Sequence, residues 1–372
     1  MPIAAAPPQR LPFAGSICLS MIVRNESAVI ARCIEAVRPL IGAWAIVDTG
    51  SGDGTQARIG ELLGDLPGRL IERPWVDFAT NRNQALELAR AYGRYALIVD
   101  ADEVVELDPR HAWPNALDAP GYYLRIYQHG GSVEYLCAKL LRHDVPWRWH
   151  GVLHEYPATE PMVAVDVLDG LRVRAVPDGA RSRRPQHEKY IEDARVLEAA
   201  LRTEPDNARY VFYYAQSLRD AGQREPALAA YRRRAAMGGW DEEVWYARYQ
   251  IALLHEALGH EEATVIDAYL GAYDTRPTRA EPLCDLARYL RLRGRYGSAY
   301  LHACAAAAHA QPDDALFVDR SVYQWRARDE QAVAAYYVGR RAESAALCRA
   351  LLDDPALPAG ERARVAANAA FG

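Results

Sequence analysis

The chain has 372 residues, of which 50% are hydrophobic and 25% are charged. This length predicts two domains, and this composition excludes a disordered or collagen-like chain. The 44 basic and 49 acidic residues are interspersed and give a formal net charge of -5, so no cationic tract indicates a nucleic-acid binder.

The cysteines and the first residues of the chain indicate the cellular compartment of the protein. The six cysteines are scattered without a CxxC pair, and most lie within apolar runs, which favours free thiols in a reducing compartment. Pro7, Pro8 and Pro12 interrupt the start of the chain, which is not typical of a cleaved signal peptide. No run approaches the roughly 20 apolar residues of a transmembrane helix. We therefore expect a cytoplasmic protein without a transmembrane segment.

Residues 15–184 alternate between short apolar runs and amphipathic segments. The apolar runs predict strands at residues 16–23, 43–47, 69–71, 95–99, 121–127 and 139–142. The amphipathic segments predict helices at residues 27–37, 54–63 and 80–91. This order indicates an α/β domain with a mostly parallel sheet. Because ligands of such sheets bind beyond the carboxyl ends of the strands, the polar residues after each strand form the candidate site.

Residues 185–372 lack the strand pattern and predict an all-α repeat domain, preceded by a predicted linker at residues 178–185. A pattern of apolar and small residues recurs with glycines about 35–45 residues apart, at Gly222, Gly259, Gly294 and Gly339. Small residues let paired helices approach, and glycine permits the turn between them. This half resembles a tetratricopeptide-like (TPR-like) solenoid. Such repeats bind partners on a concave face, although their aromatic residues can equally fill the solenoid core.

Two carboxylates at the end of a strand carry the most specific chemical signal. Asp100 and Asp102 follow the predicted strand 95–99 and are separated by one residue. Alternation along an extended chain points both side chains to the same side. Their hard oxygen ligands suit Mg²⁺ or Mn²⁺, and such a metal is commonly shared with substrate phosphates. The alternative interpretation is an acidic turn after a strand.

Other polar segments accompany this pair in a fixed order. The first and second predicted strands and the helix before the Asp-x-Asp pair contribute Asn25, Glu26, Asp48, Arg82 and Asn83. With these segments in this order and spacing, residues 16–156 resemble the family 2 glycosyltransferases of the GT-A fold. The resemblance implies an inverting transferase that uses a nucleotide-diphosphate sugar, and we expect a UDP-sugar.

The resemblance also implies roles for residues that bind the donor. Asp48 would bind the base or the ribose, and Arg82 or Asn83 would face the nucleotide. The family often has a second Asp after the first, and Thr49 stands there instead, which leaves the choice of nucleotide open. Asn25 and Glu26 would hydrogen-bond the nucleoside, although Glu26 could equally cap the following helix.

Residues 148–157 carry a Trp-x-Gly-x-x-His-Glu element similar to one in a subgroup that modifies lipopolysaccharide cores or peptides. The resemblance makes His154 a third protein ligand of the metal beside Asp102 and Asp100, which would also orient ribose or metal-bound water. Inversion by direct displacement needs a base that deprotonates the acceptor, and Glu155 is the first candidate. The alternative is that Glu155 caps a turn or pairs with an arginine.

We therefore expect a metal-dependent glycosyltransferase whose acceptor, a peptide or a protein, is held near the TPR-like domain. A lipopolysaccharide or other saccharide acceptor is the alternative, and homo-oligomers are possible. A nucleotidyltransferase would have a Gly-rich loop after the first strand, where this chain has Arg24 and Asn25. A further alternative is a non-catalytic TPR scaffold with a decayed transferase domain, and the intact Asp100 and Asp102 pair argues against it.

Overall fold

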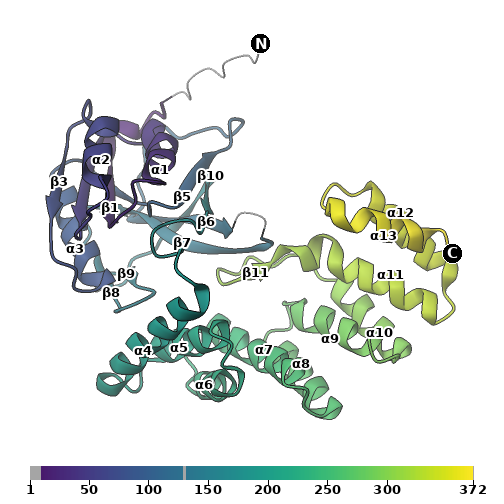
Figure 1. Ribbon diagram of the computed structural model, residues 1–372. Helices are drawn as coiled ribbons and strands as arrows, with labels where there is room; N and C mark the ends of the chain where they lie inside the picture. The colour runs from purple at the N-terminus through teal and green to yellow at the C-terminus, as the bar shows by residue number, and fades with distance from the viewer. Residues whose placement is uncertain (1–9, 129–130, 372) are drawn as a thin grey trace. The chain divides into compact units, whose positions relative to one another are not determined.

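The structure is a computed structural model that describes residues 10–128 and 131–371. Contacts divide it into two compact units (Figure 1). The first ends at Pro205 and leaves out Ser132–Glu134, which belong with the residues from Asp206 onward to the second. Helix α4 (Gln186–Thr203) is therefore grouped with the first unit. The expected domain boundary between residues 184 and 185 stays a prediction.

The first unit is built on a sheet with the strand order β3-β2-β1-β4-β7-β6-β10-β5. The parallel strands of one half are β3 (Gly68–Glu72), β2 (Ala43–Asp48), β1 (Ile17–Val23) and β4 (Tyr95–Ile98). The other half consists of β7 (Val133–Arg142), β6 (Gly121–Gln128), β10 (Asp166–Ala175) and β5 (Glu103–Leu107). A separate hairpin joins β8 (Arg148–His150) and β9 (Tyr156–Ala158). The six strands expected from the sequence are confirmed, whereas β5, β8, β9 and β10 were not predicted.

Helices cover both faces of this sheet. They are α1 (Ile30–Val37), α2 (Thr55–Leu63) and α3 (Phe78–Ala89). Leu19 and Met21 of β1 point into the core that α1 and α2 complete, whereas Cys18 points to the core of α3. Successive residues of a strand face opposite sides, so a strand between two helical layers is apolar throughout. This explains why the central strands were readable as continuous apolar runs.

The second unit is a row of helical hairpins. Its helices are α5 (Ala208–Asp220), α6 (Arg224–Ala236), α7 (Asp241–Ala257), α8 (Glu262–Thr275), α9 (Glu281–Arg291), α10 (Tyr296–Ala307), α11 (Ala327–Tyr337), α12 (Arg341–Asp353) and α13 (Ala359–Ala369). The turns inside the four pairs from α5 to α12 contain Gly222, Gly259, Gly294 and Gly339, with φ angles of 75°, 69°, 73° and 84°. Glycine adopts this left-handed conformation without steric cost, so the predicted turn glycines are confirmed.

The connection between α10 and α11 contains a short strand, β11 (Val318–Asp319), and a π-helical turn at Val322–Arg326. Strand β11 pairs in antiparallel fashion with Glu134 and Val133 at the start of β7.

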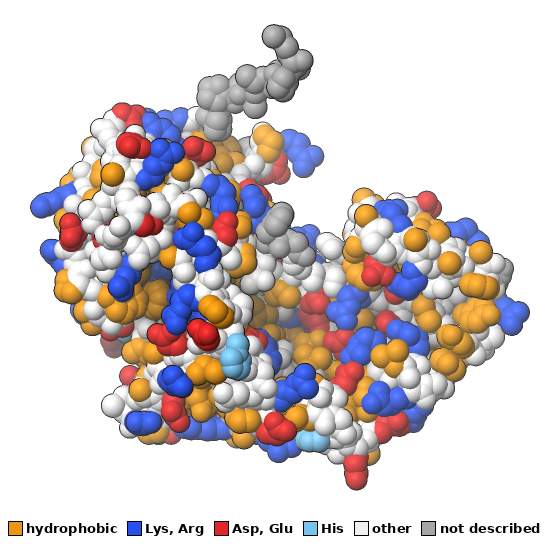
Figure 2. All heavy atoms as spheres, viewed as in Figure 1, with side chains coloured by type: hydrophobic (Ala, Val, Ile, Leu, Met, Phe, Trp, Pro, Cys, Tyr) orange, Lys and Arg blue, Asp and Glu red, His pale blue; other side chains and the backbone are white. Residues whose placement is uncertain are grey.

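Some features concern both units. Basic and acidic side chains are interspersed on the face drawn in Figure 2. All six cysteines are free thiols, as predicted, and four of them are buried. Within residues 10–128 and 131–371, no helix is both long enough and apolar enough to span a membrane.

Candidate functional site

The carboxyl ends of β1, β2 and β4 lie at one edge of the sheet because these neighbouring strands are parallel. The loop after β2 is tied to the end of β1 through Asn25. Its backbone N–H donates to Ser51 Oγ, and its Oδ1 accepts from the N–H of Gly52, both at 2.9 Å. Asn25 has a φ of 57°, a left-handed conformation in which asparagine is enriched. The structure thus uses the Asn25 side chain to hold the loop.

Asp48, at the end of β2, is completely buried. Its Oδ1 accepts from the N–H groups of Gly50 and Ser51, both at 2.8 Å. Its Oδ2 is buried and has no hydrogen-bond partner among the residues that the structure describes. Buried polar atoms are nearly always hydrogen-bonded, so this oxygen lacks the partner that a buried acceptor normally has.

Glu26 does not cap the following helix, because its carboxylate accepts from the N–H of Ala180 at 3.1 and 3.2 Å. Burial raises the pKa of Glu26 to about 7; the Ala180 hydrogen bond opposes this shift and the charge of Asp102 adds to it. At the start of α2 it is Asp53 that accepts from the N–H of Thr55. Glu26 therefore belongs to the strand-edge cluster of carboxylates.

Asp102 lies against residues 178–183, the segment predicted as a linker. Ser182 Oγ donates to Asp102 Oδ2 at 3.4 Å, and a Cβ atom at Gly179 would lie only 2.8 Å from the same oxygen. Asp178 forms two hydrogen bonds of 2.7 Å with Arg32. Burial and the charge of Asp100 both raise the pKa of Asp102. The segment therefore closes over the candidate site and is not a free connection.

Arg82 of α3 joins two candidate residues that are distant in sequence. Its Nε donates to Glu155 Oε1 at 2.5 Å, and its Nη2 donates to Asp100 Oδ1 at 2.7 Å. The guanidinium also lies over the ring of Trp149, 5.1 Å from its centroid. Burial raises the pKa of Asp100, but the charges of Arg82 and Lys139 outweigh this effect and lower it. Of the two interpretations of Glu155, pairing with an arginine is the one that the structure displays, and its role as a base stays a prediction.

Asn83 lies next to Arg82 but makes different contacts. Its Nδ2 donates to the carbonyl of Trp149 at 3.0 Å, and its Oδ1 accepts from the N–H of Trp149 at 2.9 Å. This bidentate amide holds β8 against α3. Asn83 therefore positions the Trp149 backbone, and the structure does not bring its side chain to the strand edge.

A buried ion pair behind the Asp-x-Asp turn was not predicted from the sequence. Lys139 Nζ donates to both carboxylate oxygens of Glu103, at 2.7 and 2.9 Å, and Glu103 Oε2 accepts the N–H of Asp100 at 2.9 Å. Burial lowers the pKa of Lys139, but the charges of Glu103 and Asp100 outweigh it and raise the pKa. A lysine within the apolar run of β7, in a chain with only two lysines, was the available signal.

His154 is exposed and has a φ of 52°. Among the described residues, no three His, Cys, Asp or Glu side chains are arranged as a metal-binding group. The structure therefore does not assemble His154 with Asp100 and Asp102. The two aspartates still offer oxygen ligands, and Asp102 forms no ion pair with another described residue.

Comparison with known proteins identifies the segment that contains this site. Residues 18–111 match the model of Glycosyl transferase family 2. The chain carries a family 2 glycosyltransferase domain. The matched segment includes Asn25, Asp48, Arg82 and both aspartates of the Asp-x-Asp turn, and it ends before Glu155.

A curated relative that covers most of the chain contains TPR repeats. A TPR repeat-containing protein of Synechococcus elongatus is 27% identical over 311 residues, which cover 79% of this chain and 75% of that protein. Among solved structures, the C-terminal part of a TPR repeat-containing protein from Cytophaga hutchinsonii has 13% identity and a TM-score of 0.38, covering 48% of this chain and 66% of that one. A thermophilic TPR protein of Thermus thermophilus has 15% identity and a TM-score of 0.35, covering 49% and 91%. The helical hairpins of the second unit and the match to the Synechococcus protein agree in placing a TPR-like region after the family 2 domain.

Proposed function

We propose that the protein transfers a sugar, with inversion, from a nucleotide-diphosphate sugar bound at the carboxyl ends of β1, β2 and β4. The observation that carries the proposal is the set of carboxylates at these parallel strand ends, Asp48, Asp100 and Asp102, within the segment that matches the family. Asp48 would bind the nucleoside, and its Oδ2 has no other hydrogen-bond partner among the described residues. A UDP-sugar is the proposed donor.

Asp102 would hold a divalent cation, Mn²⁺ or Mg²⁺, together with Asp100. The fit rests on the chemistry of the two side chains: both are carboxylates, and burial together with the charge of Asp100 raises the pKa of Asp102, which a cation would offset. When bound, such a cation would neutralise negative charge on the leaving diphosphate. The role of His154 as a third ligand belongs to the same proposal.

Glu155 is proposed as the base that takes the proton of the acceptor. The hydrogen bond that Arg82 Nε donates to Glu155 Oε1 would keep this carboxylate oriented. The proposed acceptor is a peptide or a protein, because the second unit belongs to a class of repeats that binds polypeptides. A saccharide acceptor is the competing outcome.

The test is a panel of nucleotide sugars, with Mn²⁺ or with Mg²⁺, in which transfer to peptide and saccharide acceptors is detected by mass spectrometry. Asp48→Asn should weaken donor binding, and Glu155→Gln should remove transfer while donor affinity is kept. Asp169→Asn changes an exposed carboxylate of β10 and serves as the matched control. If no nucleotide sugar binds or reacts under any of these conditions, the proposed function is wrong.

A further inference from the structure

The connection between α10 and α11 departs from the repeat pattern. It spans residues 308–326, whereas the links between the preceding hairpins span only residues 237–240 and 276–280. Part of this connection, residues 314–319, contacts the first helices of three successive hairpins: α5, α7 and α9. We call residues 314–319 the strap.

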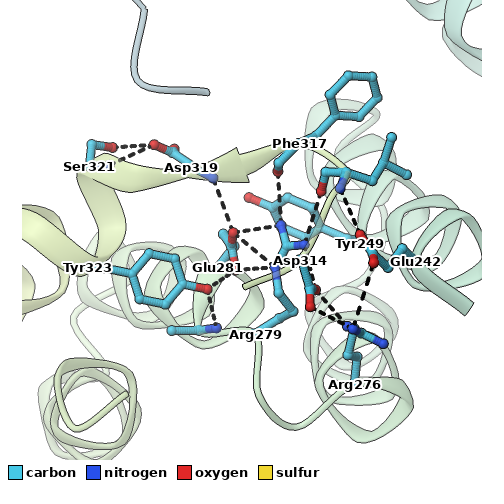
Figure 3. Close-up of polar contacts among 12 residues, drawn as sticks. Glu242, Tyr249, Arg276, Arg279, Glu281, Asp314, Phe317, Asp319, Ser321 and Tyr323 are labelled. Atoms are coloured by element: carbon cyan, nitrogen blue, oxygen red, sulfur yellow. Dashed lines mark hydrogen bonds and ion pairs between the residues drawn. The ribbon is translucent and has the colours of Figure 1, made fainter. Parts of the chain in front are cut away.

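A buried charge cluster anchors one end of the strap (Figure 3). Asp314 accepts two hydrogen bonds of 2.6 Å from Arg276 and one of 3.0 Å from Arg279. The side chain of Arg279 is completely buried and also pairs with Glu281. Burial raises the pKa of Asp314, but the hydrogen bonds of the two arginines outweigh it and lower the pKa. The neighbouring Asp313 is exposed and forms no ion pair with another described residue, so the cluster selects one of two adjacent carboxylates.

Side chains of the repeats also bind the backbone of the strap. Arg279 Nη1 donates to the carbonyl of Leu316 at 3.1 Å, and Glu242 Oε2 accepts the N–H of the same residue at 2.7 Å. Glu281 Oε1 accepts the N–H of Asp319 at 3.2 Å. Main-chain hydrogen bonds give affinity for a peptide, and side-chain pockets give specificity. The strap is therefore held as a bound peptide would be.

An aromatic side chain provides the second anchor. The ring of Phe317 lies 4.9 Å from the ring of Tyr246 on α7 and 6.5 Å from that of Phe212 on α5, measured between centroids. Phe317 has a φ of 46°, a conformation that is uncommon for a bulky residue and that surrounding contacts must enforce. The strap thus presents an acidic residue followed by an aromatic residue three positions later.

We propose that the strap is a built-in ligand of the helical repeats, and that the face it covers binds an extended peptide with the same pattern, an acidic residue followed three positions later by an aromatic one. The strap is tethered at both ends, so its effective concentration at this face is of millimolar order and a free peptide must compete with it. The proposal is independent of sugar transfer, because every residue that carries it belongs to the second unit.

The test supplies the strap as a separate peptide. In the full chain, Asp314→Ala combined with Phe317→Gly removes both anchors, and glycine accommodates the positive φ. A labelled synthetic peptide of residues 310–320 should bind this variant at least tenfold more tightly than it binds the unsubstituted protein. At about 100 times its Kd the peptide should raise the Tm of the variant by about 5–10 °C. A peptide with Asp313→Ala should act like the parent peptide, and one with Asp314→Ala should not.

Each result of this experiment either supports or overturns the proposal. If the variant is folded but the parent peptide neither binds nor stabilises it, the proposal is overturned. Equal binding of the Asp313→Ala and Asp314→Ala peptides also overturns it, because the cluster then does not select the acidic residue. If the variant is unfolded alone, recovery of its helical circular dichroism with millimolar peptide supports the proposal. Failure to recover under these conditions shows that the strap is an inseparable part of the core and overturns the proposal.

Discussion

Replacing Arg82 by methionine should destabilise the first unit strongly, because two carboxylates lose their common cation. The side chains of Arg82 and Glu155 are each 10% exposed, whereas that of Asp100 is 36% exposed. Removing one partner of a buried pair costs about 3–5 kcal/mol. The more exposed pair with Asp100 adds at most about 1 kcal/mol. We therefore expect Arg82→Met to lower the free energy of unfolding by about 3–5 kcal/mol.

Urea unfolding of the full chain at pH 7 measures this loss, which with a slope of about 2 kcal/mol per M moves the midpoint by roughly 1.5–2.5 M. The matched control is Arg58→Met, since the pair of Arg58 with Glu61 is exposed and should contribute less than about 0.5 kcal/mol. Combining Arg82→Met with Glu155→Met should cost less than the sum of the two single changes, by at least about 1 kcal/mol. Equal costs for Arg82→Met and Arg58→Met, or strict additivity in the cycle, would refute the reasoning.

Three further predictions concern the same unit. Lys139→Met leaves Glu103 buried without its partner and should lower the free energy of unfolding, measured in urea, by about 3–5 kcal/mol. Adding Glu103→Met to this variant should restore most of the loss, and a double variant that is no more stable than Lys139→Met would contradict the pairing argument. The folded-state pKa of Glu26, about 7, exceeds its ordinary value of 4.5, so wild-type stability falls as pH rises between these values. Glu26→Gln should therefore be about 2–3 kcal/mol more stable than wild type at pH 8 and equal to it at pH 4.5, and thermal unfolding with equal differences at both pH values would count against the shift. Chelation of divalent cations should weaken donor binding about as much as Asp102→Asn does, and unchanged calorimetric titrations would show that Asp102 holds no cation.

The central strands could be predicted because helices cover both faces of the sheet, which makes the strands continuously apolar. Strand β10 could not be predicted in this way. It carries Asp169, Arg172 and Arg174 among its apolar residues, and its pairing with β6 shifts register between Val167 and Arg172. The three-residue strands β8 and β9 are too short for any period to be read. The sequence pattern therefore predicts an element only where its burial follows a regular pattern over enough residues.

Residue types at the strand ends could be read from the sequence, but their partners could not. Arg82 or Asn83 was expected to face the nucleotide, and the contacts of Arg82 with Asp100 and Glu155 join positions 18 and 73 residues away. Such distances in sequence leave no local signal. The adjacent Asn83 shows the same limit, because nothing in its neighbourhood indicates that the backbone of Trp149 occupies its amide.

Residues 178–183 show why composition alone does not identify a linker. The prediction of a linker at residues 178–185 rested on its arginine, proline and glycine content, and proline and glycine are common in exposed turns. In the structure the absence of a side chain at Gly179 lets the segment approach Asp102, and the amide of Ala180 gives the carboxylate of Glu26 a hydrogen-bond donor. A partly buried carboxylate needs hydrogen-bond donors, and a polar segment packed against it can supply them. Since the donor is proposed to bind at the same strand ends, this segment would form part of the wall of the proposed site, held there by its contacts with Glu26 and Asp102.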